Sequence, residues 1–93
     1  MTLIGRWKKV PGDPCDRRYP EELQFFEATY LGRKGPGQGF ILWDAGGYEL
    51  LGPNQVKFDI VTDQQVVYRL SVSDSEFTAV DPQGCTLRYR RAD

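Results

Sequence analysis

The feature that most constrains the fold of this chain is a strict alternation of apolar and polar residues in short segments separated by turn-forming residues. In the segment Gln55–Val61, the apolar Val56, Phe58 and Ile60 occupy every second position. The segment Gln65–Val72 repeats this pattern after a short polar turn. A period of two places successive side chains on opposite faces of a β-strand, so each segment is expected to bury one face.

Eight such segments follow one another at intervals of about eight to twelve residues, a spacing typical of all-β sandwiches and barrels. The expected strands are Leu3–Val10, Leu23–Leu31, Phe40–Trp43, Tyr48–Leu51, Gln55–Val61, Gln65–Val72, Ser75–Val80 and Cys85–Arg91. Asp44–Gly47 is expected to form a tight turn, and Pro20–Phe26 is the best place for a single helical turn. The pattern predicts one all-β domain over residues 1–93, built as a small antiparallel meander.

We expect this meander to close into a barrel of about eight short strands, because an open sheet would leave two unpaired edge strands. With an even number of strands, the first and the last run antiparallel and can pair with each other. Residues near Val10 would then lie beside Cys85. An odd number of strands would remove this pairing.

The alternation also predicts the core of the barrel. Nine residues of the later strands are expected to be buried: Val56, Phe58, Ile60, Val66, Tyr68, Leu70, Phe77, Leu87 and Tyr89. Eight aromatic residues could point inward: Trp7, Phe25, Phe40, Tyr48, Phe58, Tyr68, Phe77 and Tyr89. A barrel of this size is just wide enough for its own side chains, so a packed core is the first interpretation. The second is a small aromatic-lined pocket at an open end, with Trp7, Tyr48, Tyr68 and Tyr89 as candidates.

Composition excludes several classes of function. The net charge of the 93 residues is −1, which argues against a nucleic-acid partner. No apolar run is long enough to span a bilayer and no hydrophobic signal segment opens the chain, so we expect a cytoplasmic domain without membrane contact. Histidine is absent, which removes the commonest general base and metal ligand. We therefore expect no metal, no cofactor and no catalytic residues.

Two stretches of the sequence resemble a known family. They are the G-x-W opening at Gly5–Trp7 and the final run Asp81–Arg91, in which a turn leads into an aromatic and basic strand. Together they resemble the lipocalin-like superfamily of antiparallel barrels, and more narrowly its short bacterial members. The resemblance implies that Trp7 closes one barrel end, with a basic side chain of the last strand over its ring. The inward parity of Arg91 makes it the expected partner.

The first and last strands also carry a group of basic residues. If the two strands pair, Arg6, Lys8, Arg88 and Arg90 share the outer face of the barrel. We call these four residues the basic strip. Like charges side by side on a sheet are mildly destabilising. The strip is either a solvated outer face or a contact surface for an acidic protein or another polyanion.

The chain has two cysteines, Cys15 and Cys85, and closure of the barrel could bring them close together. Two interpretations stay open. A disulfide needs Cα atoms within about 7 Å, which this layout permits. In a cytoplasmic chain, two unrelated thiols are favoured instead, because that compartment keeps thiols reduced.

The remaining motifs point to no reaction. The paired acids Glu21 and Glu22 lack the spacing of a calcium loop, and the glycine-rich stretch Gly32–Gly39 lacks a phosphate-binding pattern. We therefore expect a binding or interaction module without catalysis, whose partner is an unidentified protein or a small apolar ligand. The alternatives are an accessory subunit of a protein assembly, or a small enzyme with a site at the barrel mouth.

Overall fold

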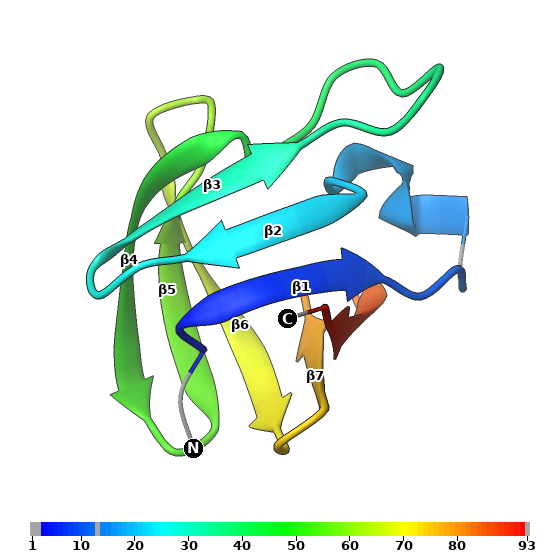
Figure 1. The fold of residues 1–93 in the computed structure, drawn as a ribbon. Helices are drawn as coiled ribbons and strands as arrows, with labels where there is room; N and C mark the ends of the chain where they lie inside the picture. The colour runs from blue at the N-terminus through cyan, green and yellow to red at the C-terminus, as the bar shows by residue number, and fades with distance from the viewer. Residues whose placement is uncertain (1–2, 13, 93) are drawn as a thin grey trace.

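The computed structural model describes residues 3–12 and 14–92, and within them the chain forms a closed antiparallel barrel (Figure 1). Each strand pairs with the next along the chain, and the last pairs with the first. The strands are β1 Gly5–Lys9, β2 Glu22–Phe25, β3 Thr29–Arg33, β4 Ala45–Gly52, β5 Gln55–Asp59, β6 Gln65–Val72, β7 Glu76–Val80 and β8 Thr86–Arg91. The one helical element within these described ranges is the short 3₁₀ helix η1, Pro14–Arg18. The predicted all-β barrel of eight strands is confirmed.

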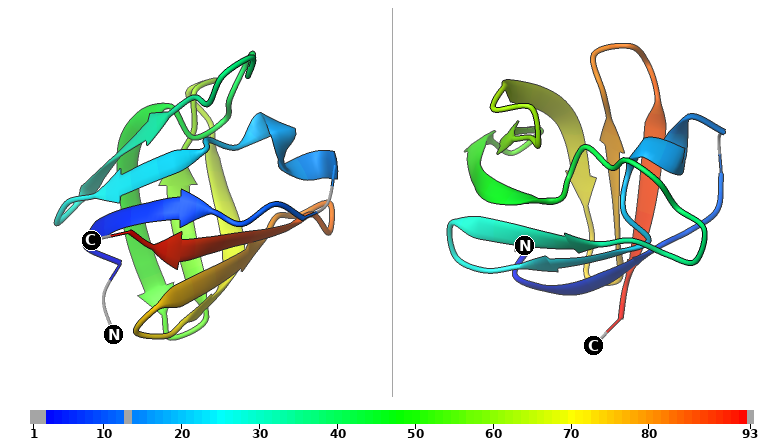
Figure 2. Two further views of the ribbon diagram at one scale, coloured as in Figure 1. Left: turned by 45° about the vertical axis from the view of Figure 1, so that its right-hand side comes forward. Right: turned by 90° about the horizontal axis from the view of Figure 1, so that it is seen from above.

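The strand pairing that closes the barrel joins β1 to β8. Trp7 lies opposite Arg91, and Lys9 lies opposite Tyr89. Backbone hydrogen bonds continue the pairing beyond both strand ends, from the amide of Val10 to the carbonyl of Arg88 and from the amide of Ala92 to the carbonyl of Arg6. Figure 2 shows β8 lying along β1, which completes the ring of strands.

Two of the predicted strands were wrong. One of them is a pair of strands and the other is not a strand, so the predicted number of eight is still correct. Leu23–Leu31 was expected to be one strand, but it is the hairpin of β2 and β3. Phe25 pairs with Tyr30, and the amide of Phe26 donates to the carbonyl of Thr29 across the turn. The turn contains Glu27 and Ala28, residue types that are depleted in strands.

Residues 40–43 were expected to be a strand but form none. This segment makes isolated backbone contacts instead: the amide of Leu42 donates to the carbonyl of Arg18, and its carbonyl accepts from the amide of Val61. The parity is also reversed. Ile41 and Trp43 are buried, whereas Phe40 is 59% exposed, so the prediction that Phe40 points inward was wrong.

The predicted turn at Asp44–Gly47 is instead the start of β4, which continues through both glycines. A Cβ atom at Gly46 would lie 2.7 Å from the carbonyl oxygen of Asp59, and one at Gly47 would lie 2.9 Å from the Asp59 carboxylate. The glycines are therefore needed for close packing against the end of β5 rather than for a turn. Pro20–Phe26, the best candidate for a helical turn in the sequence, forms none and contains β2 instead.

Aromatic rings fill the inside of the barrel. Eight of the nine predicted core residues are buried, and Val66 is half-buried. Three large buried residues escaped the alternation, because they lie in connections or in misplaced segments: Tyr19, Tyr30 and Trp43. Phe58 has the most ring contacts of the core, with Phe25, Tyr30, Trp43, Tyr48 and Tyr68. The interior is thus a packed core.

Trp7 lies at the barrel end where β1 begins, and it has the environment that the resemblance implied. The indole is 1% exposed, and the guanidinium carbon of Arg91 lies 4.2 Å from the ring centroid. The indole N–H donates to the carbonyl of Leu3 at 2.8 Å. Arg91 also donates to the carbonyl oxygens of Ile4 and Asp74. The predicted cation–π pair between Trp7 and Arg91 is confirmed.

Phe40 and Phe58, which were both predicted to point inward, provide a test of this core. Phe58→Ala should lower the free energy of unfolding by about 3–5 kcal/mol, because it leaves a cavity among five aromatic rings. Phe40→Ala should change it by less than about 0.5 kcal/mol, because the ring is mostly exposed. Denaturant unfolding followed by far-UV circular dichroism measures both. A large loss for Phe40→Ala would contradict the observed parity.

Candidate functional site

Four connections meet at the barrel end opposite Trp7: residues 10–21, 34–44, 60–64 and 81–85. Between them lies an open pocket of about 440 Å³, which we call the mouth. Leu42, Ile60 and Val66 contribute apolar side chains to its lining. Tyr19, Tyr68 and Asp81 contribute polar groups, and so do Arg18, Gln64 and Gln83. The mouth therefore combines an apolar wall with a few polar groups, as small-molecule sites do.

The polar groups of the mouth form a chain of hydrogen bonds with a fixed direction. The Tyr19 hydroxyl donates to Asp81 Oδ2 at 3.1 Å, and it lies 3.2 Å from the Tyr68 hydroxyl. An ionised carboxylate only accepts, so the single hydroxyl proton of Tyr19 is used by Asp81. Tyr68 must then be the donor to Tyr19. Asp81 Oδ1 in turn accepts from the backbone amides of Gln83 and Cys85.

Burial keeps the Tyr19 and Tyr68 hydroxyls of this hydrogen-bond chain protonated. Burial is the largest cause that raises the pKa of Tyr19, and the hydrogen bond with Tyr68 and the nearby Asp81 carboxylate raise it further. Burial also raises the pKa of Tyr68, against a smaller opposing effect of its hydrogen bonds. Within the described residues, the buried indole N–H of Trp43 has no hydrogen-bond partner of good geometry. It lies close enough to lower the pKa of Tyr68.

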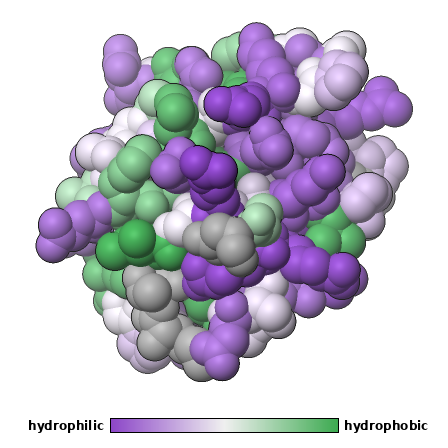
Figure 3. Space-filling model, in the orientation of Figure 1, coloured by the Kyte–Doolittle hydropathy of each residue, from purple (hydrophilic) through white to green (hydrophobic). Residues whose placement is uncertain are grey.

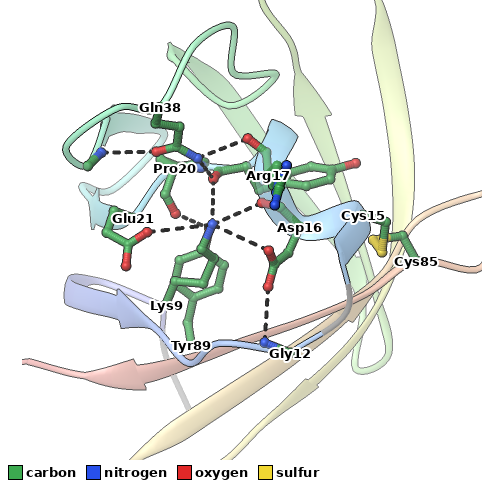
Figure 4. A network of polar contacts seen from close by, with 12 residues as sticks. Lys9, Gly12, Cys15, Asp16, Arg17, Pro20, Glu21, Gln38, Cys85 and Tyr89 are labelled. Atoms are coloured by element: carbon green, nitrogen blue, oxygen red, sulfur yellow. Dashed lines mark hydrogen bonds and ion pairs between the residues drawn. A yellow bond between two sulfur atoms is a disulfide. The ribbon is translucent and has the colours of Figure 1, made fainter.

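A disulfide between Cys15 and Cys85 forms part of the wall of the mouth. Its sulfur atoms are 2.08 Å apart and its Cα atoms 6.0 Å apart. The expectation of two free thiols was wrong, because η1 turns the chain that leaves β1 back toward the start of β8 (Figure 4). By the chain-entropy argument, a bridge across 70 residues stabilises the fold by about 4 kcal/mol. Disulfides persist mainly in oxidising compartments, so the bond gives no support to a cytoplasmic location.

Lys9 holds the connection between β1 and β2 against the barrel. Its ammonium donates to the carbonyl oxygens of Asp16 and Tyr19, at 2.9 and 3.1 Å. The carboxylates of Asp16 and Glu21 lie 3.7 and 3.6 Å from the same nitrogen (Figure 4). Lys9 is 8% exposed. The sequence analysis missed this residue, although its inward parity, shared with Trp7, was a usable signal.

A second set of contacts ties residues 34–44 to the same connection. The Gln38 side-chain amide donates to the carbonyl oxygens of Arg17 and Tyr19, and its oxygen accepts from the amide of Gly35. Across the barrel wall, the Tyr89 hydroxyl donates to the carbonyl of Pro20 at 2.6 Å. The backbone around Tyr19 is thus fixed from several sides, which positions its hydroxyl at the mouth.

The four pocket candidates from the sequence do not line one common pocket among the described residues. Tyr68 lines the mouth. Tyr89 is fully buried in the core, and Trp7 is buried at the opposite end of the barrel. Tyr48 is half-buried beside a shallow hollow formed with Ala28 and Asp59, and its hydroxyl donates to the carbonyl of Phe26. The sequence could not identify Tyr19, because it lies outside any alternating segment.

The basic strip lies on the outer face of β1 and β8, as the pairing required. Lys8 is opposite Arg90 on β8 and opposite Glu22 on β2. Arg88 donates to Glu76 at 2.9 Å and is therefore neutralised. Among the described residues, the other three members, Arg6, Lys8 and Arg90, have no ion pair. Hydrophilic side chains predominate on the face over β1 and η1 (Figure 3).

Neither a metal site nor a membrane helix is found in the part of the chain that the structure describes. Residues 3–12 and 14–92 contain no group of three or more cysteine, aspartate or glutamate side chains placed to hold a metal ion. No helix in these ranges is long and apolar enough to cross a bilayer. Comparison of the chain with protein-family models, curated proteins and solved structures finds no match. Any argument about function therefore depends on the geometry of the mouth and of the outer face.

The two adjacent lysines of β1 allow a matched test of the contacts in Figure 4. Lys9→Met should lower the free energy of unfolding by about 2–3 kcal/mol, because it leaves two carbonyls and two carboxylates without their cation. The loss stays below that of a fully buried pair, since the Glu21 side chain is 38% exposed. Lys8→Met, on the outer face, should change it by less than about 0.5 kcal/mol. Equal effects in denaturant unfolding would contradict the role of Lys9.

The tyrosines predict how stability depends on alkaline pH. Burial raises the pKa of all five tyrosines in the folded chain, whereas unfolded tyrosines titrate at about pH 10. Above that pH the unfolded chain loses protons that the folded chain keeps, so stability falls as the pH rises. Phenolate absorbance should therefore appear together with loss of the near-ultraviolet dichroism signal. Titration of most of the tyrosines in the folded protein near pH 10 would contradict this expectation.

Proposed function

We propose that this chain is a non-catalytic binding module that takes a small, largely apolar molecule into its mouth. The observation that carries the proposal is the open pocket of about 440 Å³, with an apolar wall and convergent tyrosine and aspartate groups. This volume lies within the range of about 300–1,000 Å³ that is usual for small-molecule sites. The surrounding connections are fixed by a disulfide and by Lys9, so the pocket is largely formed before any ligand arrives.

We further propose that the architecture is lipocalin-like. The closed antiparallel barrel and the Trp7–Arg91 contact at one end support this assignment. The chain departs from a wide-cavity barrel in one respect, because aromatic rings fill its interior. We therefore expect the ligand at the mouth and not at the centre of the barrel.

Two features favour binding over catalysis at this place. The chain has no histidine to act as a base, and the phenol protons of Tyr19 and Tyr68 are already held in hydrogen bonds. The basic strip supports a contact with an acidic protein less strongly, since Glu76 neutralises Arg88 and Glu22 lies opposite Lys8. An accessory role in an assembly would use the outer face and leave the mouth empty.

A neutral aromatic probe tests the proposed site directly. Benzyl alcohol should shift the amide resonances of residues around the mouth in a saturable titration followed by ¹H–¹⁵N NMR. The variant Val66→Gln should bind it at least about tenfold more weakly, because Val66 lines the mouth. Val67→Gln provides the matched control, since the neighbouring Val67 lies on the outer face and does not line the mouth.

The melting temperature of each variant checks that the fold is intact. Saturable shifts at the mouth that Val66→Gln weakens and Val67→Gln does not would support the proposal. Absence of shifts at the mouth, or equal binding by both variants, would overturn it.

A further inference from the structure

The direction of the hydrogen bonds at the mouth limits the chemistry of its ligand. Tyr68 donates its proton to Tyr19, and Tyr19 donates its proton to Asp81. Neither hydroxyl has a second proton, so both can only accept from a ligand. Asp81 Oδ2 accepts one hydrogen bond, from Tyr19, and a carboxylate oxygen can accept a second. Tyr19, Tyr68 and Asp81, the buried and half-buried polar residues of the lining, therefore present acceptors and no free donors to a ligand. The lining side chains that carry donors, those of Arg18, Gln64 and Gln83, are exposed.

The charge of Asp81 also favours a ligand that donates hydrogen bonds. Its carboxylate accepts hydrogen bonds from a phenol and from two backbone amides, all of which are neutral donors. Among the described residues it has no ion pair. The side chain is half-buried at the wall of the pocket. A hydrogen bond from a cation to such a carboxylate is stronger than one from a neutral donor.

An anionic ligand or a calcium ion would fit the mouth less well. The one basic residue in the lining within the described chain, Arg18, is exposed at the rim and makes no ion pair with Asp81. An anion placed deeper would meet a carboxylate and two hydroxyl oxygens that have no proton to offer. A calcium ion needs about six to eight oxygen ligands, and one carboxylate with two phenols falls short of that number.

We propose that the mouth binds a small organic amine, whose ammonium donates to Asp81 Oδ2 and whose apolar body lies against Leu42, Ile60 and Val66. This inference rests on the proposed function, because it assigns a ligand class to the same pocket.

Three probes with one aromatic body test the inference. Benzylamine, benzyl alcohol and benzoate are titrated separately into the ¹⁵N-labelled protein at neutral pH. Benzylamine should bind at least about tenfold more tightly than benzyl alcohol, and benzoate should bind most weakly. On binding of benzylamine, the side-chain carboxyl ¹³C resonance of Asp81 should shift, a measurement that needs no variant.

Two variants separate the carboxylate from general charge. Asp81→Asn keeps an oxygen that can accept from the amides of Gln83 and Cys85, so it should lose the preference for benzylamine and bind benzyl alcohol within about twofold of the parent. Asp63→Asn removes the same charge from the 60–64 connection, outside the lining, and should keep the preference. Asparagine tolerates the positive φ of 61° at that position.

The outcomes distinguish the two proposals. If benzyl alcohol binds at the mouth and benzylamine binds no more tightly, the amine inference fails while the proposed function stands. If none of the three probes shifts the mouth, the proposed function itself fails. If Asp63→Asn and Asp81→Asn weaken benzylamine equally, the preference reflects net charge, and the assignment to Asp81 is overturned. If Asp81→Asn does not fold, an Asp81 carboxyl resonance unchanged by benzylamine overturns it.

Discussion

The pairing of β1 with β8 is the constraint on which the rest of the structure depends. It converts a meander of hairpins into a closed wall, and it places Trp7 beside Arg91 at one end. At the other end it brings the chain that leaves β1 next to the start of β8, where Cys15 can reach Cys85. Without that pairing, the core would be exposed along two open edges, and the mouth would lose one of its walls.

The shape of the mouth depends on contacts that hold two irregular connections in place. Residues 10–21 are held by the disulfide and by the Lys9 ammonium, and residues 34–44 are held through Gln38. These contacts are mostly to backbone carbonyls, which would otherwise require water at a crowded barrel end. Their effect on the site is indirect but specific, since Tyr19 belongs to the connection that they hold and is the middle member of the hydrogen-bond chain from Tyr68 to Asp81.

The alternation of apolar and polar residues predicted the regular strands of the second half of the chain. β5, β6, β7 and β8 lie within about two residues of their expected bounds, because each buries one face against the same core. Prediction failed where another constraint takes over: the turn at Glu27 and Ala28 interrupts an apolar run, and Gly46 and Gly47 serve close packing and not a turn. The predicted number of strands is therefore correct in part because one predicted strand proved to be two and another proved to be none.

The candidate site was predicted less well than the fold, for the same physical reason. Tyr68 is on a regular strand and was identified, but Tyr19 and Asp81 are in connections, whose positions depend on tertiary contacts. The disulfide followed from closure geometrically, yet the expected cellular location argued the other way. Composition constrained the expected function and could not identify the pocket.

The cysteine bridge also bears on how the barrel can assemble. In the reduced chain, the pairing of Lys9 with Tyr89 joins residues that are eighty positions apart in the sequence, a non-local step of the kind that slows folding. With the bridge in place, the shortest covalent path runs six positions from Lys9 to Cys15 and four from Cys85 to Tyr89. The search for the closing strand pair then resembles the formation of a hairpin, with a much smaller loop-closure entropy. Oxidation thus makes the pairing of the first strand with the last a local one.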